Sequence, residues 1–228
     1  MARPASDGRT PTRTREMRAR GRQTMRTLLD AGAEVFAERG YHAARVDDVV
    51  TRANTSHGTF YLYFGNKEEL FRALAVDVAA SIVELGEALP RITADASGRQ
   101  RLREWLGRFA GLYERQQATL RAWTEAEIGD SEFGRLGDDV FAELSLVVAT
   151  RVRGAAPDDV DPATAGLAVV AMIERLHYYV ATGQVRINRE EMLDTLTAVT
   201  HGALFGVSLD ARSLPPARSR RYISPTNH

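Results

Sequence analysis

Apolar residues recur along this chain at intervals of three and four positions, which is the spacing of one apolar face of an α-helix. Outside a short central segment, this pattern predicts helices over about residues 20–38, 67–89, 99–114, 118–128, 131–152, 162–182 and 189–207. Gly40, Gly183 and a loop at residues 90–98 separate several of them. No alternating run is long enough to predict a sheet. We therefore expect an all-α protein.

The segment from residue 46 to residue 70 carries a shorter and more informative pattern. Its first apolar face consists of Val46, Val49, Val50 and Ala53. Asn54-Thr55-Ser56 then breaks the run, because asparagine tolerates the left-handed conformation of a sharp turn and Ser56 is a good N-cap. Residues 57–64 follow as a short helix rich in aromatic side chains. Helix, three-residue turn and short helix predict a helix-turn-helix, whose second helix enters the DNA major groove by its N-terminal end.

At these residues the chain resembles the DNA-binding domain of the tetracycline-repressor (TetR-type) transcriptional regulators. Residues 36–41 match a Phe-x-x-x-Gly-Tyr motif, and residues 58–64 match Gly-Thr-aromatic-Tyr-x-x-Phe. Lys67, Glu68 and Leu70 match the Lys-Glu-x-Leu opening of the next helix. The resemblance covers roughly residues 20–75, about a quarter of the chain. It implies a three-helix DNA-binding domain followed by a helical ligand-binding and dimerisation domain.

Two departures from the family pattern concern the second helix. The turn has Asn54 and Thr55 where the family has glycine and valine. Before the helix, the family has serine or threonine, whereas this chain has Ala44-Arg45. We expect Asp47 or Asp48 to supply the missing helix cap instead.

We expect DNA contacts from the turn, from the start of the recognition helix and from the residues that follow. His57 and Thr59 can reach bases or phosphates, and Gly58 lets the backbone approach the groove closely. The resemblance implies phosphate contacts at Tyr61, Tyr63 and Lys67, the last supported by backbone N–H groups at a helix start. The full predicted set is Arg45, Ser56, His57, Gly58, Thr59, Tyr61, Tyr63 and Lys67.

Several of these residues have a second interpretation. Tyr61 could divide its ring between the core and DNA, His57 could be a plain surface residue, and Lys67 could be a solvated charge. Phe60 and Phe64 are expected in the core.

Charge is distributed unevenly along a chain whose formal net charge is zero. Residues 1–26 carry a net charge of +6, residues 27–211 carry −10, and residues 212–228 carry +4. An acidic body with basic tails would repel DNA everywhere except at the intended face. We predict a disordered basic arm over residues 1–18, a helix-turn-helix domain over 19–66, a helical ligand-binding and dimerisation domain over 67–210, and a basic tail over 211–228.

The second domain is expected, from the resemblance, to enclose a small-molecule pocket and to form a homodimer. The dimer would use the eighth and ninth predicted helices, residues 162–182 and 189–207. Small residues would permit close helix approach in the ninth: Ala198, Gly202, Ala203 and Gly206. Candidate pocket residues are Trp105, Phe109, Tyr113, Trp123, Phe141, Met172 and Tyr178. Such a stripe of large side chains at helical spacing is also typical of plain core.

Two groups of residues that contain acids have open interpretations. Glu174 and His177 have a spacing that could bind a metal, but no third ligand is near, and an ion pair or a buried hydrogen bond is the favoured alternative. Trp123, Glu125 and Glu127 could present a carboxylate to a cationic ligand, or the acids could be simply solvated.

Absent motifs narrow the function class. The sequence contains no Gly-x-Ser-x-Gly, no His-Glu-x-x-His and no glycine-rich phosphate loop, so we expect neither an enzyme nor a cofactor. It has no cysteine, no membrane-length apolar run and no secretory signal, which predicts a soluble cytoplasmic protein. We expect a sequence-specific transcriptional regulator, most simply a dimeric repressor that a small molecule releases from an inverted-repeat operator on double-stranded DNA. The alternative is an architectural or nucleoid-type DNA-binding protein without a ligand.

Overall fold

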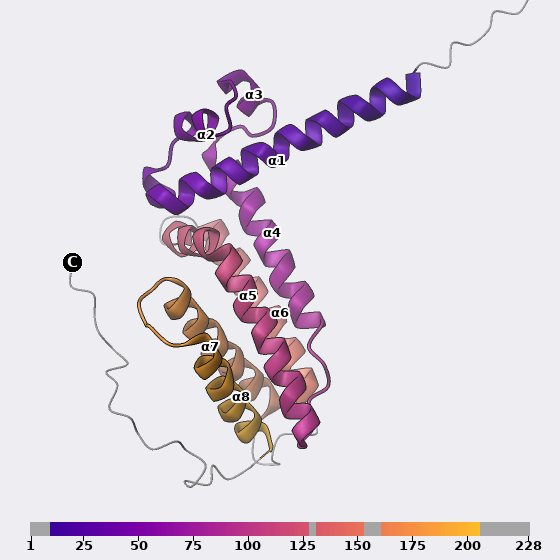
Figure 1. Cartoon of the computed structure of the whole chain (residues 1–228), viewed down its shortest axis with the longest axis vertical. Helices are drawn as coiled ribbons and strands as arrows, with labels where there is room; N and C mark the ends of the chain where they lie inside the picture. The colour runs from indigo at the N-terminus through magenta and orange to yellow at the C-terminus, as the bar shows by residue number, and fades with distance from the viewer. Residues whose placement is uncertain (1–9, 128–130, 153–160, 206–228) are drawn as a thin grey trace, which may run out of the picture. The chain divides into compact units, whose positions relative to one another are not determined.

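The structure is a computed structural model that describes residues 10–127, 131–152 and 161–205, with side chains from residue 19 onwards (Figure 1). This part of the chain is all-α and contains no strand. Its helices are α1 (Thr10–Ala43), α2 (Val46–Arg52), α3 (His57–Tyr61), α4 (Lys67–Glu87), α5 (Ala96–Glu127), α6 (Ser131–Val152), α7 (Pro162–Ala181) and α8 (Arg189–Phe205). The chain divides into two compact units, which meet in the sequence at Leu74 and Ala75. No described helix combines the length and the apolar character needed to cross a membrane.

The first unit is built from α1, α2, α3 and the start of α4. Gly40 ends the regular part of α1 with φ of 73°, a left-handed conformation that favours glycine. The core holds Phe36 and Phe71, whose ring centroids lie 4.9 Å apart in an edge-on contact. At Gly32, an added Cβ would lie 2.7 Å from Leu70 Cδ2. The absence of a side chain at residue 32 therefore lets α1 and α4 pack closely.

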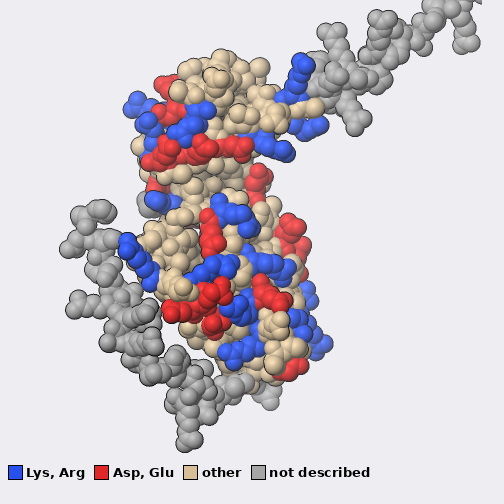
Figure 2. Space-filling view, viewed as in Figure 1, with Lys and Arg blue, Asp and Glu red and all other residues tan. Residues whose placement is uncertain are grey.

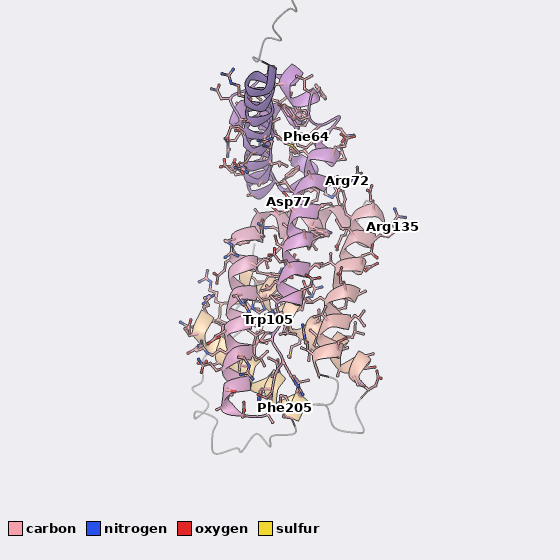
Figure 3. All side chains as sticks on the ribbon, turned by 90° about the vertical axis from the view of Figure 1, so that its right-hand side faces the viewer. Phe64, Arg72, Asp77, Trp105, Arg135 and Phe205 are labelled. Atoms are coloured by element: carbon pink, nitrogen blue, oxygen red, sulfur yellow. The ribbon has the colours of Figure 1, made fainter. Side chains whose placement is uncertain are left out.

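In the second unit, α5 is packed against α6, α7 and α8, and α6 is packed along α7. Trp105 lies inside this unit (Figure 3), and its Nε1 donates to the carbonyl oxygen of Leu85 at 2.8 Å. A Cβ at Gly166 would lie 2.6 Å from the carbonyl oxygen of Ser145, so α7 approaches the backbone of α6 directly. This packing buries the apolar faces that the sequence pattern predicts.

Charged side chains connect α8 to the outside of α5. Arg103 donates to Glu190 at 2.6 Å and to Asp194 at 2.7 Å, and Arg189 donates to Glu114 at 2.9 Å. Figure 2 shows basic and acidic side chains interleaved on the visible face of this unit. Exposed pairs of this kind each contribute little, but the network fixes which part of α8 faces α5.

Two predicted element boundaries were wrong. Residues 10–18, which the prediction placed in the basic arm, belong to α1, and residues 1–9 of that predicted arm lie outside the described residues. The break predicted near residues 115–117 does not occur, because Arg115-Gln116-Gln117 contains no glycine or proline, and α5 runs through it. The predicted eighth and ninth helices are therefore α7 and α8.

Two further boundaries differ from the prediction by smaller amounts. The recognition helix is shorter than expected, with α3 ending at Tyr61 and a turn covering residues 62–63. The units divide at residue 74 and not at residue 66, because Leu70 and Phe71, at the start of α4, are buried in the core of the first unit. The predicted basic tail over residues 211–228 lies outside the described residues.

The loop before α5 is organised around one carboxylate. Asp95 Oδ1 accepts hydrogen bonds from the Gly98 backbone N–H and from the hydroxyls of Thr93 and Ser97, each at 2.8 Å. These bonds, the Gly98 N–H first among them, lower the pKa of Asp95 from 3.8 to about 2. A Cβ at Gly98 would lie 2.0 Å from the Thr93 carbonyl oxygen, so no side chain fits there.

Asp95 should therefore stabilise the fold in a pH-dependent way. A lowered pKa means that its contribution is complete above the ordinary value of 3.8 and is lost as the pH falls towards about 2. Asp95→Asn should melt at a lower temperature than wild type at pH 7, and the difference should shrink between pH 4 and pH 2. Melting curves of both proteins and of Asp139→Asn, an exposed carboxylate on α6, would measure this. A difference that does not change with pH would contradict the assignment.

Candidate nucleic-acid interface and ligand cavity

Local hydrogen bonds fix the turn between α2 and α3. The Arg45 backbone N–H donates to Asp48 Oδ2 at 3.1 Å, so Asp48 closes the start of α2, as one of the two predicted caps. Asn54 has φ of 49°, the left-handed conformation expected at the turn. Ser56 Oγ accepts from the Thr59 backbone N–H at 3.1 Å and caps α3, as predicted. The sequence of the turn thus determines the angle at which α3 leaves α2.

One face of α3 is exposed and the other holds the core. Phe60 and Phe64 are buried with ring centroids 5.8 Å apart, in agreement with the prediction. On the opposite side, Tyr61 is exposed and Leu62 is 82 % exposed. Leu62 did not stand out in the sequence, although an aliphatic residue between two tyrosines is the one signal that could have pointed to it. Leu62 therefore lies beside Tyr61 on the exposed side.

His57 is exposed at the first position of α3 but is not without a partner. Its Nε2 lies 2.6 Å from Asp47 Oδ1 on α2. The carboxylate therefore orients the imidazole, and it also places a negative charge beside the surface expected to face DNA. Arg45, the residue before α2, is likewise exposed.

Thr59 and Tyr63 are less accessible than the sequence suggested. Both are half-buried. The Thr59 hydroxyl lies 3.0 Å from Ser56 Oγ, so these two predicted contact residues are bonded to each other. A Cβ at Gly21 would lie 3.5 Å from the Tyr63 hydroxyl, which places that hydroxyl beside α1.

Gly58 has no side chain, although the fold leaves room for one. Its φ is not positive, and a Cβ there would meet only Ser56 Oγ, at an ordinary contact distance of 3.7 Å. A helix with glycine at an interior position is also less stable than one with alanine there, by roughly 1 kcal/mol. Nothing in the protein itself therefore requires glycine at residue 58, which supports a role in close approach to another molecule.

Lys67 is not the solvent-facing residue predicted at the start of α4. Its Nζ donates to the carbonyl oxygens of Tyr41, Ala44 and His42 at 3.0, 3.1 and 3.2 Å. The ammonium group also lies 5.1 Å from the centre of the Tyr41 ring. A lysine ammonium has three N–H donors, and all of them are engaged by backbone carbonyls, two at the end of α1 and one at Ala44 in the connection to α2. The side chain thus joins α4 to the end of α1 and to this connection.

We therefore expect Lys67→Ala to lower the stability of the fold by about 1–3 kcal/mol, because it leaves three carbonyl oxygens without their charged donor. Arg45→Ala is the matched control, since it removes a nearby exposed cation. Thermal and denaturant unfolding of both variants would measure the difference. If Lys67→Ala unfolds like Arg45→Ala, the side chain is a solvated charge after all.

Because Lys67 is the only lysine in the sequence, amine-reactive labelling offers a second test, and Nζ should be protected until the protein unfolds.

Ion pairs hold α2 against α1. Arg52 donates to Glu38 at 2.6 Å and to Glu34 at 2.8 Å, and Arg39 lies 3.2 Å from Asp48. The Arg52 guanidinium lowers the pKa of Glu38 through their hydrogen bond. Because Arg52 binds both Glu34 and Glu38, it fixes the position of α2 along α1.

The second unit contains a cavity of about 260 Å³ between α5, α6 and α7, with one residue from α4. Its lining includes five of the predicted pocket residues: Phe109, Tyr113, Trp123, Phe141 and Tyr178. The remaining lining residues are Ile82, Leu120, Thr124, Glu127, Gly137, Asp138, Val140, Leu144, Val170, Glu174 and Arg175. The sequence pattern placed the aromatic residues on helices but did not show that they surround one space.

Two predicted pocket residues do not line this cavity. Trp105 is a buried core residue whose indole N–H donates to the Leu85 carbonyl oxygen. Met172 is not among the residues that line the cavity. Glu174 and His177 do not pair either. The His177 Nδ1 lies 2.7 Å from the Ile173 carbonyl oxygen, and the ring packs edge-on against Phe109 with centroids 5.1 Å apart. Burial lowers the pKa of His177 and favours the neutral ring. The predicted buried hydrogen bond thus forms with backbone.

Residues 28–74 match the family described as "Bacterial regulatory proteins, tetR family". The HTH-type transcriptional regulator EthR of Mycolicibacterium smegmatis is 28% identical over 210 residues, which cover 89% of this chain and 95% of that protein. The A-factor receptor protein of Streptomyces griseus is 28% identical over 156 residues, covering 67% of this chain and 53% of the relative. These relatives are named as a regulator and a receptor, not as enzymes.

Solved structures share the fold. A TetR-like transcriptional regulator from Rhodococcus sp. RHA1 matches with a TM-score of 0.64 and 24% identity, over 79% of this chain and 95% of that one. A transcriptional regulator from Aquifex aeolicus VF5 matches with a TM-score of 0.61 and 20% identity, over 79% and 97%.

An N-terminal helix-turn-helix unit followed by a helical unit defines the class of DNA-binding transcriptional regulators. Within that class, this chain is similar to the TetR family, whose model matches residues 28–74, and to the regulator EthR over most of both chains.

Proposed function

We propose that this regulator is a dimeric repressor that binds an inverted-repeat operator and leaves it when a small molecule occupies the cavity. The observation that carries the proposal is the exposed face of α3, which is held rigidly by Phe60 and Phe64 but presents Gly58, Tyr61 and Leu62 to solvent. A surface of this kind, fixed in position and open at the N-terminal end of the helix, suits the major groove.

Contacts to DNA can be divided by chemistry. His57 would reach a base edge or a phosphate, and its pairing with Asp47 sets its orientation before binding. Arg45 and Tyr61 are exposed and would contact phosphates. Thr59 would offer its methyl group to a thymine methyl, since its hydroxyl is bonded to Ser56. Tyr63 would contact DNA through the edge of a half-buried ring, and at Lys67 only the helix start, not the ammonium, would contribute.

The dimer would form through α7 and α8. Both helices expose apolar side chains, with Leu167 48 % exposed on α7 and Val199 39 % exposed on α8. Small residues near them, Ala171 on α7 and Ala203 on α8, are also exposed and would let partner helices approach closely. Exposed apolar residues flanked by small ones are typical of an interface between helices.

We predict that Leu167→Glu combined with Val199→Glu converts a dimer into a monomer. Four carboxylates would be buried in a symmetric interface, and burying unpaired charge costs several kcal/mol. Leu146→Glu is the matched control, because Leu146 is 65 % exposed on α6. Light scattering at micromolar concentration would give the mass of each protein. A monomeric wild type, or a double variant that stays dimeric, would contradict the assignment.

Coupling of the two units would use α4. This helix begins at Lys67, which is bonded to the end of α1 and to Ala44, and it contributes Ile82 to the cavity lining. A ligand that displaces α4 would therefore act on residues that hold the helix-turn-helix. The relative named the A-factor receptor protein is, by that name, a receptor, which supports a ligand role for the cavity.

Selection from a random duplex library tests the function. A dimeric repressor should recover one motif with dyad symmetry, whose half-sites are centred about one helical turn apart. The alternative, an architectural DNA-binding protein, should recover no motif and should bind all duplexes with a similar dependence on salt. An architectural protein of this kind would also have no ligand for the cavity.

A further inference from the structure

The cavity is lined by aromatic rings and by more acid than base. Its described lining includes the carboxylates of Glu127, Asp138 and Glu174, against a single cationic residue, Arg175. Five aromatic side chains, listed above, complete the walls. An aromatic face attracts a cation through its ring quadrupole, and a carboxylate attracts it directly. The two kinds of group therefore favour the same ligand charge.

Glu127 is held in the cavity wall by the shape of α6. A Cβ at Gly137 would lie 2.7 Å from Glu127 Oε1, so the carboxylate occupies space that a side chain at residue 137 would fill. Burial, together with the charges of Asp138 and Glu174, raises the pKa of Glu127. Burial and the neighbouring carboxylates thus outweigh the two groups that act in the opposite direction on Glu127, namely the charge of Arg175 and a hydrogen bond with Trp123.

Glu174 is poorly compensated as well. Arg175 Nε lies 3.6 Å from Glu174 Oε2, a long contact. The guanidinium is exposed and lies over two tyrosine rings, 5.4 Å from the centre of Tyr178 and 5.8 Å from that of Tyr179. Burial raises the pKa of Glu174 despite this arginine and despite the hydrogen bond from the buried Tyr113 hydroxyl. Because Arg175 lies over the two tyrosine rings, it neutralises the cavity carboxylates incompletely, and the cavity keeps an excess of negative charge.

We propose that the effector is an organic cation, a hydrophobic amine or quaternary ammonium whose charge is shared by Glu127 and Glu174 while its apolar part packs on the aromatic walls. This inference rests on the proposed function, in which the cavity receives the effector. The volume lies just below the usual range of roughly 300–1,000 Å³ for ligand sites, so the ligand is small.

Other occupants fit less well. An anion would approach three carboxylates in a partly desolvated space, where repulsion is strong. A metal ion is also disfavoured, since no group of three or more potential metal ligands converges anywhere in the described part of the chain. A cation that carries its own apolar surface satisfies both the charge and the walls.

Three probes with one shared scaffold test the charge preference: para-tert-butylbenzylamine, para-tert-butylbenzyl alcohol and para-tert-butylbenzoate. Isothermal titration of the full chain at pH 7 should rank them in that order, with the protonated amine bound about tenfold more tightly than the alcohol. Equal affinity of the amine and the alcohol, tighter binding of the benzoate, or failure of the amine to bind at millimolar concentration would overturn the proposal.

Charge-neutral variants locate the site. Glu127→Gln and Glu174→Gln should each weaken binding of the amine about tenfold and leave binding of the alcohol unchanged. Glu143→Gln is the control, because Glu143 is exposed on α6 and does not line the cavity. Amine binding that survives both cavity variants, or that falls equally in the control, would place the cation elsewhere and contradict the proposal.

Release from DNA is measured separately, by fluorescence anisotropy of an operator duplex with and without the amine. Tight, Glu127-dependent binding of the amine without release would retain the organic-cation site and reject the ligand-responsive repressor. Release by the alcohol and the amine alike would retain the repressor and reject the cation preference.

Discussion

Replacing Gly58 with leucine is expected to abolish specific DNA binding while leaving the fold at least as stable as wild type. The protein has room for a side chain at this position, because an added Cβ meets only Ser56 Oγ at 3.7 Å. Leucine is also a better helix former than glycine. In a groove, however, the new side chain would separate α3 from the base edges. Affinity for the operator should fall to the non-specific level, about 10³-fold or more below specific binding.

Gly134→Leu is the matched control for this prediction. Gly134 lies on α6, and a Cβ there would meet nothing within 4 Å. Both variants should melt at or above the temperature of wild type, but only Gly58→Leu should lose the operator in an anisotropy titration. Wild-type operator affinity in Gly58→Leu would show that α3 does not enter the groove by its N-terminal end.

Replacing Phe64 with alanine is expected to cost about 3–5 kcal/mol of folding free energy. Phe64 is buried beside Phe60, and its removal opens a cavity in the core that supports α3 (Figure 3). DNA binding should also fall, but only as a consequence of unfolding, and it should recover at low temperature where the variant is folded.

Leu62→Ala separates this scaffold effect from surface contact. Leu62 is two residues from Phe64 but is almost fully exposed, so its truncation should change stability by less than about 0.5 kcal/mol. Denaturant unfolding of both variants would decide the matter. Comparable destabilisation at residues 62 and 64 would mean that the exposed and buried faces of α3 are wrongly assigned.

Features set by neighbouring residues could be predicted from the sequence. The left-handed Asn54, the Ser56 cap and the Asp48 cap each depend on contacts within three or four positions along the chain. The burial of Phe60 and Phe64 follows equally from helical spacing and the motif. These features define the helix-turn-helix, which explains why the amino-acid sequence alone indicates the DNA-binding class.

Features set by distant residues could not be predicted in the same way. Lys67 bonds carbonyls more than twenty positions earlier, and the spacing that identified it gives no sign of where its ammonium points. Trp105 and Phe109 lie one turn apart on α5, yet only Phe109 lines the cavity. The acidic lining comes from three different helices, so its excess charge appears only when α5, α6 and α7 are packed together.

Hydroxyl-radical footprinting of the selected duplex tests the central claim most directly, namely that two copies of α3 read one operator. The predicted result is two protected regions related by dyad symmetry on one side of the duplex, about 34–36 Å apart, present with wild type and missing with Gly58→Leu. A single asymmetric footprint, or symmetric protection that Gly58→Leu leaves unchanged, would contradict it.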